Sequence, residues 1–138
     1  MNNVEIIYPV LAHMLLVVFL YIPLIIRKSK AVKDNAVDLK ETALNNQAWT
    51  PDVQKVSNNI ANQFEIPILF YALCIIIALT HNVGMLNVGL AWSYVALRYV
   101  HTYVHIGSNF VPLRMRIFAL SLVIILAMLI QLSVQLVQ

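Results

Sequence analysis

The sequence predicts an all-α integral membrane protein, a bundle of four transmembrane helices in a single domain over residues 1–138. Of its residues, 61% are hydrophobic and only 11% are charged, whereas soluble domains average about 25% charged residues. The mean hydropathy of +0.80 agrees with a membrane protein. The apolar residues also gather in stretches suited to crossing a bilayer, at about 6–26, 64–80, 85–104 and 117–134.

The first stretch, 6–26, is long enough for about 30 Å of helix, the thickness of one bilayer core. Basic residues follow it in place of a small-residue cleavage site, so we interpret it as a retained span. The second stretch, 64–80, is shorter and needs the helical residues before it to cross the membrane. The third, 85–104, carries a single charge, Arg98, and the fourth is almost entirely apolar.

The connections between the stretches predict the topology. Residues 81–84 form a tight uncharged turn, so the second and third spans are expected to be antiparallel neighbours. All nine Lys and Arg residues lie in the long connection 27–63, in the third-to-fourth connection or at the same end of the third span. The positive-inside rule places that face in the cytoplasm and both termini on the other side, in a bacterial inner membrane. Topology also accounts for the net charge of +3, so no nucleic-acid partner is expected.

Within the long connection, Thr50-Pro51-Asp52 is typical of a helix start. It offers a capping hydroxyl, a proline in the first turn and an acid near the positive end of the helix dipole. We expect this helix to run into the second span and Pro67 to kink it, because proline cannot donate to the carbonyl of Gln63. The single cysteine, Cys74, lies in an apolar run and is interpreted as a buried hydrophobic residue.

Two polar stripes are predicted on neighbouring helices. The first consists of Lys55, Asn58, Asn62 and Glu65, which share one helical face. The second consists of Arg98, His101, Thr102 and His105. An arginine that faces lipid near the centre of a bilayer costs about 2.5–3.5 kcal/mol. We therefore expect Arg98 to face the bundle and to approach Glu65, the carboxylate nearest to a span that suits it.

Together the stripes predict a charged cleft, open to the cytoplasm, that suits a small zwitterionic or anionic ligand. The alternative is structural: Glu65 and Arg98 form a packing ion pair, and the histidines reach toward water. A metal site at His101 and His105 lacks a third ligand at suitable spacing, so no metal is expected. His13 stands alone in the sequence and is interpreted as structural, as is His81 in its turn.

Three motifs follow one another along these helices. They are Asn62-Gln63-Phe64-Glu65 with Pro67, Arg98-Tyr99-Val100-His101-Thr102, and Pro112-Leu113-Arg114. In type, order and spacing they resemble the MAPEG family, the membrane-associated proteins of eicosanoid and glutathione metabolism, and especially its microsomal glutathione transferases. The resemblance covers most of residues 55–116, and the four-span layout extends it to the whole chain.

The resemblance implies a homotrimer of four-helix subunits that binds glutathione as a co-substrate between neighbouring subunits, near the cytoplasmic face. The glutathione-binding residues that it implies are Lys55, Asn58, Asn62, Glu65, Arg98, His101 and His105. Cations among them suit the carboxylates of glutathione, and Glu65 suits its amine. Arg98 and Arg114 are the expected catalytic residues, because a cation near a thiol of pKa about 8.5 lowers that pKa and raises the thiolate fraction.

The chain departs from the family pattern at three positions. Asn58 stands where family members have an arginine, and His105 stands where they have a tyrosine. Pro112 matches the position of the arginine that activates the thiol in leukotriene C synthase. Arg114 is the nearest substitute, as in the microsomal transferases.

The predicted function is a membrane-bound, glutathione-dependent transferase or peroxidase that acts on hydrophobic electrophiles or lipid hydroperoxides. The alternative is a non-catalytic binding or scaffold protein of the same fold, which glutathione affinity without turnover would favour. A third hypothesis, a small transporter with Glu65 as a proton-coupled site, needs a water path between both faces of the membrane. The polar residues gather at one face only, which disfavours it.

Overall fold

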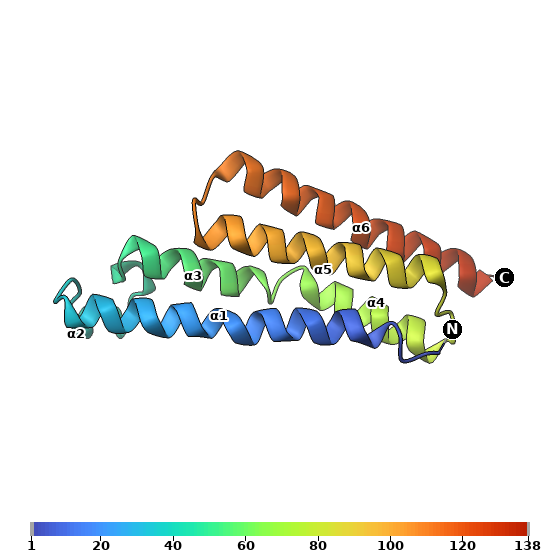
Figure 1. Cartoon of the computed structure of the whole chain (residues 1–138), viewed down its shortest axis with the longest axis horizontal. Coiled ribbons are helices and arrows are strands. Elements are labelled where there is room, and N and C mark those ends of the chain that lie inside the picture. Colours follow the sequence, from blue (N-terminus) through green and yellow to red (C-terminus); the bar gives the residue numbers. More distant parts are fainter. Residues whose placement is uncertain (1, 138) are drawn as a thin grey trace.

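Four helical rods lie side by side in the computed structural model, which describes residues 2–137 (Figure 1). The rods are α1 (Ile7–Lys33), the consecutive helices α3 (Pro51–Asn62) and α4 (Pro67–Leu79), α5 (Met85–Ile106) and α6 (Val111–Val137). Two short pieces, α2 (Leu39–Thr42) and η1 (Asn46–Ala48), connect α1 to α3. The start of α1 and the end of α6 lie at the same end of the bundle, opposite α2 (Figure 1).

Within residues 2–137, three helical stretches are long and apolar enough to cross a membrane: α1, the α3–α4 rod and α6. Many of their large apolar side chains face outward, as expected of a surface that meets lipid. The predicted all-α membrane class is therefore confirmed. With 22 residues, α5 is long enough to span a bilayer, but it carries Arg98 and several other polar side chains and does not belong to this apolar set.

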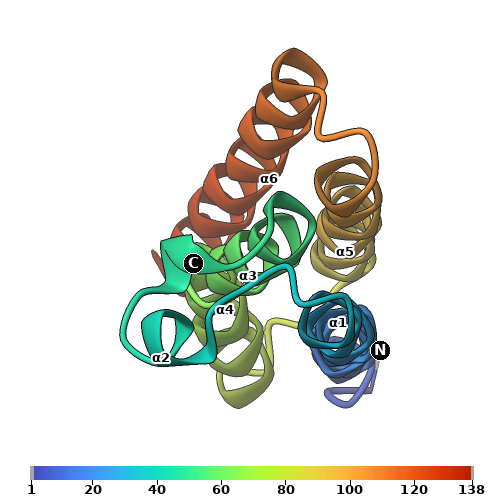
Figure 2. The same ribbon diagram turned by 90° about the vertical axis from the view of Figure 1, so that its left-hand side faces the viewer.

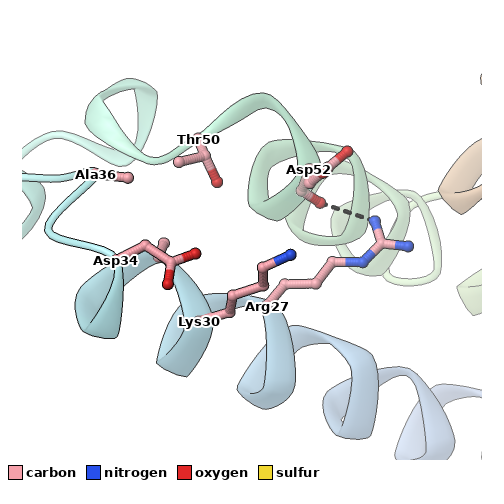
Figure 3. Close-up of a pocket in the computed structure, with 7 residues that line it drawn as sticks. Arg27, Lys30, Asp34, Ala36, Thr50 and Asp52 are labelled. Carbon is pink, nitrogen blue, oxygen red and sulfur yellow. Dashed lines mark hydrogen bonds between the residues drawn. The ribbon is translucent and has the colours of Figure 1, made fainter.

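The helices extend beyond the apolar stretches from which they were predicted. α1 continues through its basic residues as far as Lys33. Two lysines in its last turn stabilise the helix, because their charge interacts favourably with the negative end of the helix dipole. The ammonium of Lys28 lies 4.5 Å from the centre of the Trp49 ring, which ties the end of α1 to η1. Arg27 donates to the carbonyl oxygens of Asp52 in α3 (2.9 Å, Figure 3) and Ile106 in α5 (3.0 Å). Much of the connection 27–63 is therefore helical, and these contacts hold the end of α1 against η1, α3 and α5.

The α3–α4 rod begins and breaks near the predicted positions. α3 starts at Pro51 with Asp52 in its first turn, although the Thr50 hydroxyl makes no capping hydrogen bond, contrary to expectation. The predicted kink at Pro67 is a full interruption, because residues 63–66 are not helical and Pro67 is the first residue of α4. The carbonyl of Asn62, at the end of α3, is thereby left without a helical partner.

The rods pack so that the two halves of the broken rod have different neighbours. α3 packs on α1 and α5, whereas α4 packs on α1 and α6 (Figure 2). α5 runs antiparallel to the α3–α4 rod, as predicted, and its most extensive contact is with α6. The predicted neighbours, the second and third spans, also meet through side chains of α4 and α5, because the Phe70 ring stacks on the Tyr94 ring with ring centres 4.4 Å apart.

Two apolar clusters form the core. The larger one joins α1, α4, α5 and α6 and includes Cys74, which is buried as predicted. A smaller one contains Leu20, Val56 and Ile60. Along α1, the broken rod and α5, a set of buried polar residues lies between these two clusters: His13, Asn59, Gln63, Arg98, His101, Thr102 and His105. This polar layer supports the candidate site.

Candidate functional site

Arg98 is fully buried at the centre of the polar layer. Its Nε and Nη2 donate to Oε1 of Gln63 at 3.3 and 2.9 Å. Nη2 also donates to the carbonyl oxygen of Asn62 at 3.1 Å. Because this carbonyl is the one freed where α3 ends, the guanidinium also caps the negative end of that helix. The helix break thus supplies an acceptor that the buried cation needs.

The predicted pairing of Arg98 with Glu65 is wrong. Among residues 2–137, the ion pair within 4.0 Å is that of Lys55 with Asp52, at 3.4 Å, and Glu65 is exposed. The prediction placed Glu65 on the face of a continuous helix that also carries Asn62. The helix ends at Asn62, so that periodicity no longer holds, and Gln63 turns inward with 1% of its surface exposed.

Gln63 connects Arg98 to a chain of hydrogen bonds that ends at His105. Because its oxygen accepts from Arg98, its amide nitrogen donates to Thr102 Oγ1 (3.2 Å) and Asn59 Oδ1 (3.3 Å). The Thr102 hydroxyl also donates to Asn59 Oδ1, at 3.2 Å. Asn59 therefore uses its Nδ2 to donate to Nδ1 of His105, at 3.1 Å. Neutral His105 is thus held with its proton on Nε2, as a hydrogen-bond donor.

His13 belongs to the same layer and is not isolated, in contrast to its position in the sequence. The Tyr71 hydroxyl donates to Nδ1 of His13 at 2.6 Å, and Nε2–H of His13 donates to Oε1 of Gln63 at 3.2 Å. These contacts give His13 the structural role that was predicted for it. The amide oxygen of Gln63 therefore accepts from both a buried histidine and a buried arginine.

Thr102→Val is expected to lower the free energy of unfolding by about 1–3 kcal/mol, because it removes a hydroxyl that both accepts and donates inside the layer. Thermal unfolding of the detergent-purified protein measures this loss. Thr80→Val is the matched control, since the Thr80 hydroxyl is exposed and bonds only to its own helix and to the neighbouring Asn82. Equal melting temperatures for the two variants would contradict the proposed contribution of the layer.

Six of the predicted site residues line two adjoining hollows between α3, α5 and α6. Arg114 lines both hollows. The smaller hollow, of about 200 Å³, is lined by Pro51, Gln54, Lys55, Asn58, His105, Asn109 and Arg114. The larger, of about 340 Å³, is lined by Asn62, His101, Arg114, Met115, Phe118, Ala119 and Leu122. We call the two hollows together the Arg114 groove. At this end of the bundle α6 leans away from the other helices (Figure 1).

The Arg114 groove has a polar part and an apolar part. Arg114 is half-buried, and its Nη1 donates to Oδ1 of Asn109 at 2.6 Å. His101 lies behind it, buried, with a ring nitrogen, Nδ1, that has no partner among the described residues. Phe118 lies against His101, with ring centres 6.0 Å apart. Cations and amides on one side suit carboxylates, while the apolar wall of α6 suits a hydrophobic molecule.

Two predicted ligand residues do not line the groove. Arg98, which was predicted as a catalytic residue as well as a ligand residue, lies in the polar layer behind the groove, and Glu65 is on the exposed surface after the helix break. Within the part of the chain that the structure describes, no three His, Cys, Asp or Glu side chains come together as metal ligands. The groove therefore offers charge and hydrogen bonds from Lys55, Arg114, His105 and the asparagines.

Comparison with known proteins identifies the family of this chain. The model of one family, the MAPEG family, matches residues 6–134, from the residue before α1 into the last turns of α6. The chain belongs to the MAPEG family. Membership makes it a membrane protein of the family of eicosanoid and glutathione metabolism, and it confirms the resemblance seen in the three motifs. No match was found among curated proteins or among solved structures.

In this MAPEG chain the motif residues divide between two tasks. Gln63, Arg98 and Thr102 hold the polar layer, whereas Asn62, His101 and Arg114 line the groove. The contribution of Asn59 was not predicted from the sequence. A signal was present, because Asn59 and Gln63 are four residues apart and form a second polar row, displaced by one residue from the row of Asn58 and Asn62.

Proposed function

We propose that this MAPEG protein is a membrane-bound, glutathione-dependent transferase or peroxidase that acts on hydrophobic electrophiles or lipid hydroperoxides. In this proposal α5 also spans the membrane, as the third of four spans along the chain, and the protein is a homotrimer in a bacterial inner membrane with both termini away from the cytoplasm. Glutathione binds at the cytoplasmic side, between subunits. The observation that supports the proposal is the Arg114 groove, which combines cations and amides with an apolar wall.

Glutathione presents two carboxylates, an amine, two peptide groups and a thiol. Lys55, Arg114 and Nε2–H of His105 are suited to the carboxylates, and the side chains of Asn58 and Asn62 to the peptide groups. Glu65, exposed on the surface of one subunit, would accept from the amine of a ligand held partly by its neighbour. Arg98 acts as a positioning residue, because it holds Gln63 and Asn62 from behind the groove.

The chemistry follows from a cation beside the thiol. The Arg114 guanidinium would favour the thiolate of glutathione over the thiol by lowering the thiol pKa. In conjugation, the thiolate sulfur attacks an electrophilic carbon, a C–S bond forms, and the leaving group departs with its electron pair. With a hydroperoxide, the sulfur attacks the terminal oxygen, the O–O bond breaks, and the alkoxide takes a proton. A second glutathione then reduces the sulfenic acid, which yields glutathione disulfide and water.

A non-catalytic binding protein of the same fold remains the second candidate. The observation that favours it is that two cations already have partners within the chain. Arg98 is hydrogen-bonded to Gln63 and Asn62, and Lys55 pairs with Asp52. Fewer cations are then free to activate a thiol. Saturable glutathione binding without turnover of any electrophile would establish this function.

Isothermal titration of glutathione into the detergent-purified protein tests the proposal. We expect saturable binding by the wild type and about tenfold weaker binding by Arg114→Ala, which corresponds to about 1.4 kcal/mol. Arg116→Ala is the matched control, because Arg116 is exposed on the same helix and lines neither hollow. Chlorodinitrobenzene conjugation by the same sample separates an enzyme from a binding protein. The absence of saturable binding at millimolar glutathione would contradict both functions.

A further inference from the structure

Another hollow lies apart from the Arg114 groove, where the end of α1 meets the start of α3 (Figure 3). Its volume is about 160 Å³, and it is lined by Arg27, Lys30, Ala31, Asp34, Ala36, Thr50 and Asp52. The ammonium of Lys30, the carboxylate of Asp34 and the hydroxyl of Thr50 point into the same space (Figure 3). The Lys30 ammonium and the Asp34 carboxylate thus face one small cavity with Arg27 at its side, which is a zwitterionic arrangement, whereas Asp52 contributes its backbone carbonyl to the bond with Arg27.

The charges of this hollow are not neutralised by one another. Among the described residues, Asp52 pairs with Lys55, outside the hollow, and no ion pair within 4.0 Å joins Lys30 to Asp34. The start of α3 adds partial positive charge, since the Thr50 hydroxyl makes no capping bond to the first turn. One side of the hollow therefore favours an anion, beside Lys30, Arg27 and α3. The Asp34 side favours a cation.

The hollow is also continuous with the surface that meets lipid. Ile22, Ile26, Lys30 and Asp34 follow one another at four-residue spacing and form one row along α1. Ile22 and Ile26 are 53% and 62% exposed, in a helix apolar enough to cross a membrane. Lys30 and Asp34 come directly after the apolar part of this row, at the level where a bilayer changes from acyl chains to headgroups.

We infer that this hollow binds the headgroup of a zwitterionic phospholipid that carries a primary ammonium, of the phosphoethanolamine type. The phosphate lies beside Lys30, Arg27 and the start of α3. The ammonium donates to Asp34, and the acyl chains follow Ile22 and Ile26. An anionic lipid without an ammonium leaves Asp34 facing a negative headgroup, and a choline headgroup has no N–H to donate. Both classes are expected to bind more weakly.

Titration of the detergent-purified full chain with phosphatidylethanolamine, phosphatidylglycerol or phosphatidylcholine, read out by native mass spectrometry, tests the site. The wild type is expected to bind phosphatidylethanolamine about tenfold more tightly than the other two lipids. Asp34→Asn should remove the preference for phosphatidylethanolamine over phosphatidylglycerol. Lys30→Gln should weaken the binding of both phosphatidylethanolamine and phosphatidylglycerol. Lys33 is exposed and lies outside the hollow, so Lys33→Gln should change neither the preference nor the binding of the two lipids.

Equal binding of the three lipids by the wild type, or equal effects of Lys30→Gln and Lys33→Gln, would overturn the inference. Soluble phosphoethanolamine distinguishes a lipid from a free metabolite. Weak competition by the soluble headgroup supports the lipid, whereas binding as tight as that of the lipid overturns it. None of these results depends on glutathione, so the site stands or falls separately from the proposed enzyme activity.

Discussion

Gln63→Leu is expected to lower the free energy of unfolding by about 3–5 kcal/mol, because it leaves the buried charge of Arg98 without its main acceptor. Leucine has nearly the volume of glutamine, so little of the loss comes from a cavity. The Asn62 carbonyl would then be the remaining protein acceptor for the guanidinium, and Thr102 and Asn59 would each lose a donor. Thermal or denaturant unfolding in detergent measures the loss.

Glu65→Leu is the control that separates the observed partner of Arg98 from the predicted one. Glu65 is exposed and forms no ion pair within the described chain, so its replacement is expected to change the free energy of unfolding by no more than about 0.5 kcal/mol. A large loss for Glu65→Leu together with a small loss for Gln63→Leu would restore the ion pair predicted from the sequence. It would contradict the polar layer described above.

Arg114→Ala is expected to lower kcat/KM for conjugation about 100-fold at neutral pH, because the thiolate loses the cation beside it. The pH profile gives a sharper test than the rate alone. Removal of the guanidinium raises the pKa of the bound thiol toward about 8.5. Activity should then fall most at neutral pH and recover partly as the pH rises. Arg114→Lys, which keeps a positive charge, should regain part of the rate at neutral pH.

Arg116→Ala should leave both the rate and the pH profile unchanged. A uniform fall in rate at every pH for Arg114→Ala would instead indicate a role in binding or packing. In that case the thiol would be activated by another group, or not at all.

Much of the helical layout was predictable because it depends on local properties of the chain. The apolar stretches, the helix start at Pro51 and the interruption at Pro67 follow from hydropathy and from the missing N–H of proline. Most of the groove was predictable for the same reason. Lys55, Asn58 and Asn62 lie on one face of α3, and that face survives because α3 is regular as far as Asn62.

The partner of Arg98 was not predictable from helical periodicity. The prediction placed Glu65 by assuming that α3 continues past Asn62, where the helix in fact ends. Whether Glu65 or Gln63 reaches Arg98 depends on the path of the four residues after Asn62. The contribution of His13 depends on how α1 is rotated and shifted against α3 and α5. Such rotations are set by packing of whole helix faces, which the spacing of polar residues along one helix does not encode.

The proposed mechanism requires that the Arg114 groove holds glutathione with its thiol as the thiolate. Ultraviolet difference absorbance of the thiolate, recorded as glutathione is added to the detergent-purified protein at neutral pH, tests it most directly. We expect a saturable thiolate signal with the wild type and with Arg116→Ala, and a signal largely lost with Arg114→Ala. Saturable glutathione binding by the wild type without any thiolate signal would contradict the claim.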